Sequence, residues 1–326
     1  MEGQGMDVYY LGVEIGGTKQ QIAIGKADGT IVELVCEKVA LTKGALSIRE
    51  WLLEKVPVVT GKYTTNHSRI AAACIGFGGP IETGTGKVLI SVQVEGWKDF
   101  ELKTWFQKQF GVDTYVLNDT VAGGYGELVL GAGRASQNFF YTNIGTGIGG
   151  AFFIGRKYYD GAGCGAAYMG NTYIPDPFAQ RAGQATRLEN ICSGAAIESR
   201  LRQPGYVDGS SLLMELCGGD EKMLSCRMLG EAAKQGDAFA LGEIDLFARS
   251  YAIGLGNMMT SVSPDLVAIG GGVANLGEII LEPVRKYVNE VAFISVRGRC
   301  EIVQSELADH VVIAGAILYA AGCSKL

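Results

Sequence analysis

The sequence predicts an α/β protein of two domains, each built around one hairpin whose turn is rich in glycine. The first observation is an internal repeat: YLGVEIGGTKQQIAIG at residues 10–25 and YTNIGTGIGGAFFIG at residues 141–155 each read as strand, glycine–threonine turn and strand. The second is size and composition, because 326 residues with 48% hydrophobic and 19% charged side chains suffice for two ordinary domains. Two copies of one motif indicate two domains of related topology that face one cleft.

The first half of the chain alternates strand and helix patterns. Apolar, β-prone runs predict strands, and apolar side chains spaced three or four residues apart predict helices. The expected strands are residues 9–15, 20–25, 31–39, 70–77 and 114–117, and the expected helices are residues 45–56, 101–110 and 120–129. The strand at 70–77 ends in Gly78 and Gly79, and the strand at 114–117 ends in Asn118 and Asp119.

The second half becomes largely helical after its hairpin. The expected helices are residues 193–202, 211–217, 221–235, 237–259 and 311–321, and a short apolar strand at 266–269 ends in three glycines. We place a small α/β domain at residues 1–118 plus 306–326, and a larger α/β domain at residues 119–305.

Composition argues against several classes of protein. The net charge is −6 and no run of Lys and Arg forms a basic stripe, so nucleic acid is not the expected partner. The N-terminus lacks the basic start and apolar core of a secretory signal, and no uncharged apolar run is long enough to span a membrane. We therefore expect a cytoplasmic protein.

The cysteines and histidines do not suggest a metal site. All eight cysteines stand singly, none in a CxxC pair, and there are only two histidines, His67 and His310. In a chain without a secretory signal most cysteines are expected to be reduced and buried. A zinc site built from neighbouring Cys and His is therefore not expected.

The first glycine turn is a candidate phosphate loop. Gly16 and Gly17 allow backbone N–H groups to point at an anion, and Thr18 and Lys19 add a hydroxyl donor and a cation. Glu14, just before the turn, is suited to hold Mg²⁺ through a water molecule. The alternative is an ordinary hairpin turn, and the GxxxxGK[ST] pattern of a Walker loop is absent.

The second glycine turn strengthens this hypothesis. Gly145, Thr146 and Gly147 repeat the same chemistry, and two matched turns can bind the two ends of one polyphosphate. After the strand at 266–269, the sequence Gly270–Gly272 has no side chains, which would let a flat ring such as adenine lie on the backbone. The alternative for those three glycines is a tight strand-to-helix turn.

Asn118 and Asp119 lie where a buried strand meets a helix. A carboxylate at the edge of a cleft can act as a general base whose pKa is set by burial. The alternative is a helix N-cap, a position that both Asn and Asp favour.

These segments together resemble the ROK family (repressor, open reading frame, kinase), sugar kinases of the two-domain actin/hexokinase-like (ribonuclease H-like) fold. The resemblance is carried, in order along nearly the whole chain, by LGVEIGGTK (11–19), GFGGPIETGTGKV (76–88), VEGW (94–97), LND (117–119), NIGTGIGG (143–150), CSGAAIES (192–199), AIGGGVA (268–274) and SELADHVVIAGAILYAA (305–321).

The resemblance implies a role for each candidate residue. Asp119 is implied to be the catalytic base, and ATP is implied to lie on the two glycine turns with its nucleoside at Gly270, Gly271 and Gly272, together with Mg²⁺. The implied sugar-binding residues are Asn118, Glu189, Gly79, Gln93, Tyr168 and Asn171.

The chain departs from the family in the sugar and zinc regions. Tyr168 stands where the family usually has Glu, Asn171 where it has His, and Gln93 where it has Asn. The stretch resembling the family's zinc motif, residues 182–192, has one cysteine and no histidine, so no zinc is expected. We expect weak or no activity on glucose and a different preferred substrate; the alternative is that Tyr168 only packs against the domain core.

The function predicted from the sequence is an ATP-dependent sugar kinase that transfers the γ-phosphate to a hydroxyl of a hexose or hexose derivative. The alternative is a non-catalytic sugar sensor or regulator that retains the same fold, which the altered residues Tyr168 and Asn171 motivate. A homodimer is expected, and the start of the first strand near residue 8 disfavours the DNA-binding branch of the family.

Overall fold

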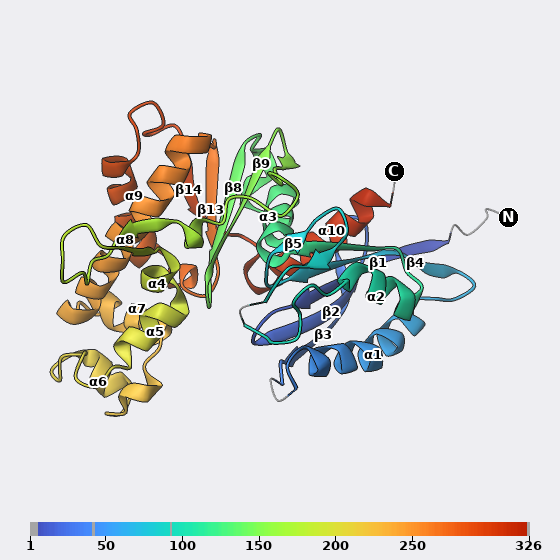
Figure 1. Cartoon of the computed structure of the whole chain (residues 1–326), viewed down its shortest axis with the longest axis horizontal. Coiled ribbons are helices and arrows are strands. Elements are labelled where there is room, and N and C mark those ends of the chain that lie inside the picture. Colours follow the sequence, from blue (N-terminus) through green and yellow to red (C-terminus); the bar gives the residue numbers. More distant parts are fainter. Residues whose placement is uncertain (1–5, 41–42, 92, 325–326) are drawn as a thin grey trace. The chain divides into compact units, whose positions relative to one another are not determined.

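A computed structural model describes residues 6–40, 43–91 and 93–324 (Figure 1). The chain divides into two compact units. The first comprises Met1–Ala135, Lys157–Ala166 and Glu306–Leu326, and the second comprises Ser136–Arg156 and Ala167–Ser305. The first unit extends beyond the predicted limits of 1–118 plus 306–326, because the helix that follows residue 118 packs on the C-terminal helix.

The first unit contains a five-stranded sheet with the order β3-β2-β1-β4-β7. Its strands are β1 (Asp7–Ile15), β2 (Lys19–Gly25), β3 (Ile31–Lys38), β4 (Ser68–Phe77) and β7 (Thr114–Asn118). The first three strands form an antiparallel meander, whereas β4 runs parallel to β1 and β7 runs parallel to β4. The carboxyl ends of β1, β4 and β7 therefore meet at one edge of the sheet, which is where the polar and glycine residues lie.

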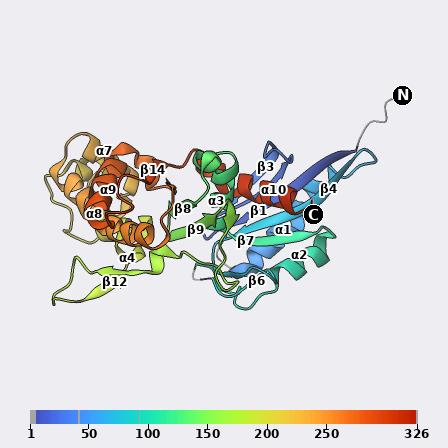
Figure 2. The ribbon, with the colours of Figure 1, turned by 90° about the horizontal axis from the view of Figure 1, so that it is seen from above.

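Helices cover both faces of this sheet. They are α1 (Ala45–Gly61), α2 (Leu102–Phe110), α3 (Asp119–Val129) and α10 (Val311–Cys323). Leu11 and Val13 of β1 join the apolar core formed with α1 and α2. Gly12 lies between them in β1 and faces the opposite side of the sheet. A Cβ at this position would lie 3.0 Å from Cγ1 of Ile317 in α10. Helices α3 and α10 lie side by side on that second face (Figure 2). The short strands β5 (Ile81–Glu82) and β6 (Lys87–Val88) form a separate hairpin.

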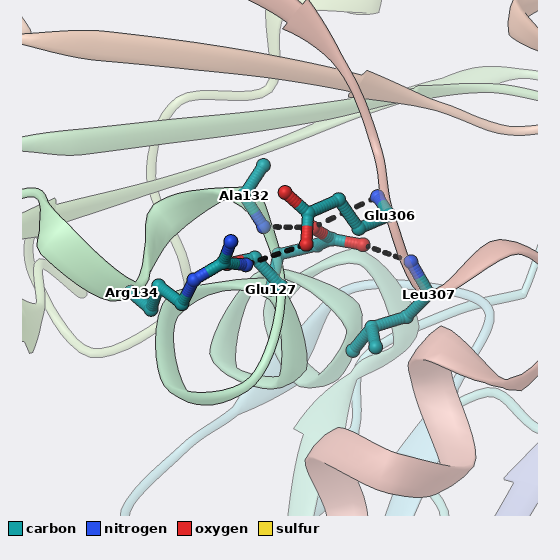
Figure 3. A network of polar contacts seen from close by, with 6 residues as sticks. Glu127, Ala132, Arg134, Glu306 and Leu307 are labelled. Carbon is teal, nitrogen blue, oxygen red and sulfur yellow. Dashed lines mark hydrogen bonds and ion pairs between the residues drawn. The ribbon is translucent and has the colours of Figure 1, made fainter.

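A buried carboxylate ties the segment before α10 to α3 (Figure 3). Glu127 of α3 is fully buried, and its Oε1 accepts the Leu307 N–H at 2.7 Å. Its Oε2 accepts the N–H groups of Ala132 at 2.8 Å and Glu306 at 3.2 Å. Arg134 adds an ion pair to the Glu306 side chain. Because a buried carboxylate needs donors, these bonds hold the returning chain against the end of α3.

The second unit repeats the same sheet pattern. Within this unit the sheet has the order β9-β8-β13-β14. The strands are β8 (Phe139–Ile144), β9 (Ile148–Ile154), β13 (Leu266–Gly270) and β14 (Glu301–Gln304). β8 and β9 form the antiparallel hairpin, and β13 runs parallel to β8 and β14. The sequence repeat thus corresponds to a repeat of topology.

The rest of the second unit is helical. Its helices are α4 (Glu189–Cys192), α5 (Gly194–Leu201), α6 (Leu212–Leu216), α7 (Cys226–Lys234), α8 (Ala238–Val262) and α9 (Glu278–Val291), and β11 (Tyr173–Pro175) pairs with β12 (Ala185–Arg187). The predicted single helix at 221–235 is wrong. Ser225 is extended and caps α7, its hydroxyl accepting the Met228 N–H at 3.3 Å, so a separate short turn, Glu221–Met223, precedes it. Among the described residues, no helix has both the length and the apolarity to cross a bilayer.

Candidate active site

The carboxyl-end edge of the first sheet brings Asp119 next to the first glycine turn. Gly78, which follows β4, donates its N–H to the carbonyl of Ile15 at 2.8 Å. A Cβ placed on Gly78 would lie 3.5 Å from Oδ2 of Asp119 and 3.6 Å from Cα of Gly16. Three segments that are far apart in the sequence therefore converge around a backbone position where glycine leaves room.

Asn118 caps α3 and thereby orients Asp119. Oδ1 of Asn118 accepts the N–H groups of Thr120 at 3.0 Å and Val121 at 3.4 Å, and its amide donates to the carbonyl of Gly79 at 3.1 Å. The N-cap alternative is thus correct for Asn118, and the cap links the ends of β4 and β7. These bonds occupy both the amide and the oxygen of the Asn118 side chain.

Asp119 is half-buried at the first residue of α3. Its Oδ1 accepts the N–H of Thr120 at 2.7 Å. Burial raises the pKa of Asp119 above its usual value, and the hydrogen bonds from Thr120 oppose that rise. A carboxylate held in this way is both oriented and more basic than a solvated one, as a general base requires.

Glu14 forms a small charged cluster beside the same edge. Its Oε2 accepts a hydrogen bond from the Gln21 amide at 2.7 Å and lies 3.5 Å from Nζ of Lys19. Burial raises the pKa of Glu14 to about 7; the nearby Lys19 lowers it, and the negative charge of Asp119 raises it. The ammonium of Lys19 therefore offsets only part of the cost of burying a deprotonated Glu14.

The donor set at this edge fits Mg²⁺. Among the described residues, no group of three or more His, Cys, Asp or Glu side chains forms a metal cage. Mg²⁺, however, is usually bound by one or two carboxylates together with phosphate oxygens and water. Glu14, whose electrostatic surroundings include the charge of Asp119, is a carboxylate of the kind that requirement names.

We expect Glu14→Gln to change how stability depends on pH. The folded-state pKa of Glu14, about 7, lies above the ordinary value of 4.5, so the folded protein binds this proton more tightly than the unfolded chain. The wild type therefore loses stability as pH rises from about 4.5 through 7, by roughly 3 kcal/mol relative to Glu14→Gln. Urea unfolding at several pH values, with exposed Glu54→Gln as the control, measures the difference. Parallel curves for wild type and Glu14→Gln would contradict this prediction.

The first turn is closed by backbone contacts and covered by Gln93. The N–H of Gly16 donates to the carbonyl of Lys19 at 3.0 Å, and the carbonyl of the exposed Thr18 accepts the Val39 N–H at 2.9 Å. A Cβ on Gly17 would lie 2.0 Å from Oε1 of Gln93, so a side chain at this position would require Gln93 to move. Gln93 is therefore beside the glycine turn.

The second glycine turn lies in the second unit against the corner between α4 and α5. The N–H of Gly145 donates to the carbonyl of Gly147 at 2.9 Å, and Thr146 between them is exposed. The carbonyl of Gly145 accepts the N–H of Gly194 at 2.7 Å. A Cβ on Gly147 would lie 3.1 Å from Oε2 of Glu189. The predicted sugar ligand Glu189 thus lies directly beside the second turn.

The N-terminus of α5 is a feature that sequence reasoning missed. Ser193 caps this eight-residue helix, and its hydroxyl accepts the Ala196 N–H at 3.2 Å. The first helical residue, Gly194, contacts Gly145 of the turn. The partial positive charge of a helix N-terminus favours an anion nearby. Only the Ser-Gly pair before an apolar helix hinted at this in the sequence.

The three glycines after β13 have different roles. A Cβ on Gly270 would lie 2.5 Å from the hydroxyl of Tyr141, and Gly271, with φ of 87°, lies against Ile144 of β8. These two positions are required by packing. Gly272 is exposed and has no neighbour within 4 Å among the described residues, so it is the one of the three that is open to a ligand.

Tyr168 and Asn171 lie on either side of Gly170, which packs against the residue that follows the second turn. They enclose a short 3-10 turn, in which the Asn171 N–H donates to the Tyr168 carbonyl at 3.0 Å. A Cβ on Gly170 would lie 2.3 Å from the carbonyl of Ile148, the residue after Gly147. Asn171 is exposed and Tyr168 is half-buried. Both therefore belong to the neighbourhood of the second turn.

Cys192, the cysteine of the stretch that resembles a zinc motif, lies at the end of α4. It is buried, and its thiol donates to the carbonyl of Phe247 at 3.7 Å. Burial also raises the pKa of this thiol far above its ordinary value. A protonated thiol bonded to the protein interior packs as an apolar side chain.

Comparison with known proteins agrees with this architecture. A family model for the ROK family matches residues 10–322. A glucokinase from Thermotoga maritima is 29% identical over 308 residues, covering 94% of this chain and 95% of the relative. A xylose repressor from Caldicellulosiruptor bescii is 25% identical over 309 residues, covering 94% of this chain but 76% of the repressor.

A solved structure shares the whole fold. The ROK family glucokinase from Streptomyces griseus, in complex with glucose and AMPPNP, superimposes with a TM-score of 0.80 at 25% identity, covering 96% of this chain and 99% of that one. This similarity confirms the actin/hexokinase-like fold class that the resemblance to the ROK family implied. With a family match that spans both units, this chain is a member of the ROK family.

Proposed function

We propose that the protein is an ATP-dependent kinase that phosphorylates a hydroxyl group of a hexose or hexose derivative. The observation that carries this proposal is the placement of Asp119, half-buried, oriented by the α3 cap and adjacent to the first glycine turn. The glucokinase relatives support the same class of reaction.

In the proposed mechanism Asp119 orients the attacking hydroxyl and accepts its proton as the oxygen bonds to the γ-phosphorus of ATP. The bond from that phosphorus to the oxygen it shares with the β-phosphate breaks, and ADP leaves. The raised pKa of Asp119 makes it a better proton acceptor near neutral pH. The N–H groups of the two glycine turns and the ammonium of Lys19 are proposed to bind the phosphates, where most of the rate enhancement of a phosphoryl transfer arises. Mg²⁺, which Glu14 would hold through water, supplies positive charge to the phosphate oxygens.

We assign the nucleoside to the turn at Gly270–Gly272 and the sugar to Glu189, Gly79, Gln93, Tyr168 and Asn171. Asn118 borders the same sugar site, where its side chain caps α3 and holds the carbonyl of Gly79. Tyr168 and Asn171 are neutral groups, and hydrogen bonds between neutral partners contribute about 0.5–1.5 kcal/mol against about 1.5–3 for charged ones. We therefore propose weak activity on glucose and a preference for a sugar with an acyl or other bulky substituent. The ring of Tyr168 supplies an apolar face for such a group.

A coupled assay for ADP release over a panel of sugars tests the proposal. Glucose, mannose, N-acetylglucosamine, N-acetylmannosamine and other N-acylated hexosamines are tested with Mg·ATP, and the proposal expects one sugar to stand out. Glucose turnover with kcat/KM near ~10⁵ M⁻¹s⁻¹, a typical enzyme value, would refute the changed preference while supporting kinase activity.

The repressor relative keeps a second candidate open, a non-catalytic sugar sensor. Asp119 and both glycine turns count against it, because a sensor needs no base and no phosphate loops. Calorimetric binding of a panel sugar, with no ADP release from any of them, would favour the sensor over the kinase.

A further inference from the structure

A buried charged cluster lies behind the corner of α4 and α5. Arg200 of α5 and Glu243 of α8 are only 7% and 6% exposed. Arg200 Nε and Nη2 lie 3.0 and 2.9 Å from Oε2 of Glu243. Tyr206 donates its hydroxyl to the other carboxylate oxygen at 2.6 Å. Burial raises the pKa of Tyr206 to about 12, so this hydroxyl remains a donor.

The remaining arm of Arg200 reaches α4. Its Nη1 donates to the carbonyl of Ile191 at 3.2 Å. α4 is a single turn, and the chain becomes extended at Ser193, with φ −69° and ψ 155°. Carbonyl groups at the end of a helix have no partner within the helix and must find one elsewhere. Arg200 supplies that partner.

The start of α4 is held by a different contact. Leu188 is fully buried against α8, where a Cβ on Gly254 would come within 2.6 Å of its side chain. Its N–H donates to the carbonyl of Thr172 at 2.9 Å. α4 is thus anchored at its start by Leu188 and at its end by Arg200. Between the two anchors it carries Glu189, whose carboxylate faces Gly147 of the second turn.

A buried ion pair contributes little net stability, because desolvation of the two charges offsets their attraction, and apolar replacements are often neutral. The planar fork of Arg, however, can bind a carboxylate and a carbonyl in fixed directions. We infer that Arg200 is a positioning residue that holds α4 so that Glu189 meets the substrate beside the second glycine turn. This inference rests on the proposed role of Glu189 in sugar binding.

The test compares Arg200→Met and Arg200→Lys with the full-length wild type. Arg200→Lys is the variant expected to fold more readily, because Lys keeps a positive charge beside the buried Glu243. Lys cannot also bind the Ile191 carbonyl in the same plane, so the contact with α4 is lost. Arg249→Met is the matched control, because Arg249 lies on α8, is exposed and pairs with Asp245 at 2.7 Å. Amide hydrogen exchange of residues 188–194 and steady-state kinetics with the best panel sugar are measured.

Both Arg200 variants are expected to exchange the amides of residues 188–194 faster, whereas Arg249→Met is not. The KM for the sugar should rise about tenfold or more, because displacing a binding group by a fraction of an ångström has an effect of this size. The KM for ATP should not change. Combined with Glu189→Gln, Arg200→Lys should add no further increase, because both changes remove the same contact.

Each contrary result has a distinct meaning. Unchanged amide exchange at 188–194 would overturn the positioning role, whether or not the protein phosphorylates a sugar. Faster exchange with an unchanged sugar KM, or additive effects of Arg200→Lys and Glu189→Gln, would overturn the link to Glu189. Absence of ADP release from every sugar with the wild type would instead refute the proposed kinase, and the exchange data would still decide what Arg200 does.

Discussion

Asp119→Asn is expected to lower turnover by about 10²–10⁴ while leaving sugar binding largely intact. Asn has nearly the same shape and can still accept the Thr120 N–H that Oδ1 accepts at 2.7 Å. It cannot take a proton from the sugar hydroxyl, so the loss should fall on kcat. ADP release and calorimetric sugar binding, measured on the same preparation, separate the two effects.

Asp28→Asn is the control for that substitution. Asp28 lies in the exposed turn between β2 and β3, where its side chain accepts the Thr30 N–H at 2.9 Å, a bond that Asn also makes. Turnover of Asp28→Asn should match the wild type. Near-normal turnover of Asp119→Asn would remove Asp119 from the role of base.

Gly315→Ala is expected to destabilise the first unit by about 3 kcal/mol, at the upper end for an overpacked interior. A Cβ on Gly315 of α10 would lie 1.7 Å from the carbonyl oxygen of Ala122 in α3. The facing position in α3 is also close, because a Cβ on Gly126 would lie 2.8 Å from the carbonyl of Val311. The atoms that would clash are backbone, so the helices themselves would have to separate.

Urea unfolding followed by tryptophan fluorescence measures this effect. The three tryptophans, Trp51, Trp97 and Trp105, all belong to the first unit, so their emission reports on it. Gly61→Ala at the end of α1, in the same unit, is the matched control, because nothing lies within 4 Å of a Cβ there. That change should be neutral or stabilise by up to about 1 kcal/mol, the helix preference of Ala over Gly. Equal stability of Gly315→Ala and wild type would show that α3 and α10 can move apart freely.

Because α3 begins at Asp119, the contact between α3 and α10 is also expected to affect catalysis. Separation of the helices would move the N-cap that orients the proposed base. Gly315→Ala should therefore lower kcat in the fraction that remains folded, in addition to lowering stability.

Several features could be predicted from local patterns. The repeat at residues 10–25 and 141–155 predicted two hairpins and, through them, the duplicated topology. The polar residues that end β7 predicted a site, because a carboxylate at the edge of a cleft can act as a general base. The order of the motifs along the chain was enough to identify the family, because family membership can be recognised from the sequence alone.

Other features were determined by contacts with solvent or with distant residues, and could not be predicted from the local sequence. Helix α1 continues through Pro57 to Gly61, past its predicted end at residue 56. Pro57 has no N–H to donate to the carbonyl of Leu53, four residues earlier. Leu53 is exposed, so water can donate to that carbonyl instead. Strand β14 is four residues long and is defined by its pairing with β13, a contact that no local pattern reports.

The sequence by itself determined the two hairpins, the family and the residue types of the candidate site, because strand periodicity and glycine turns are encoded over a few neighbouring residues. Only the tertiary structure decided which glycines have open space around them and which are needed for packing, as Gly272 and Gly271 show. It alone brought Asp119 and the first glycine turn together around Gly78, and placed Arg200 behind α4. The physical reason is that burial, pKa and close approach depend on atoms brought together from distant parts of the chain.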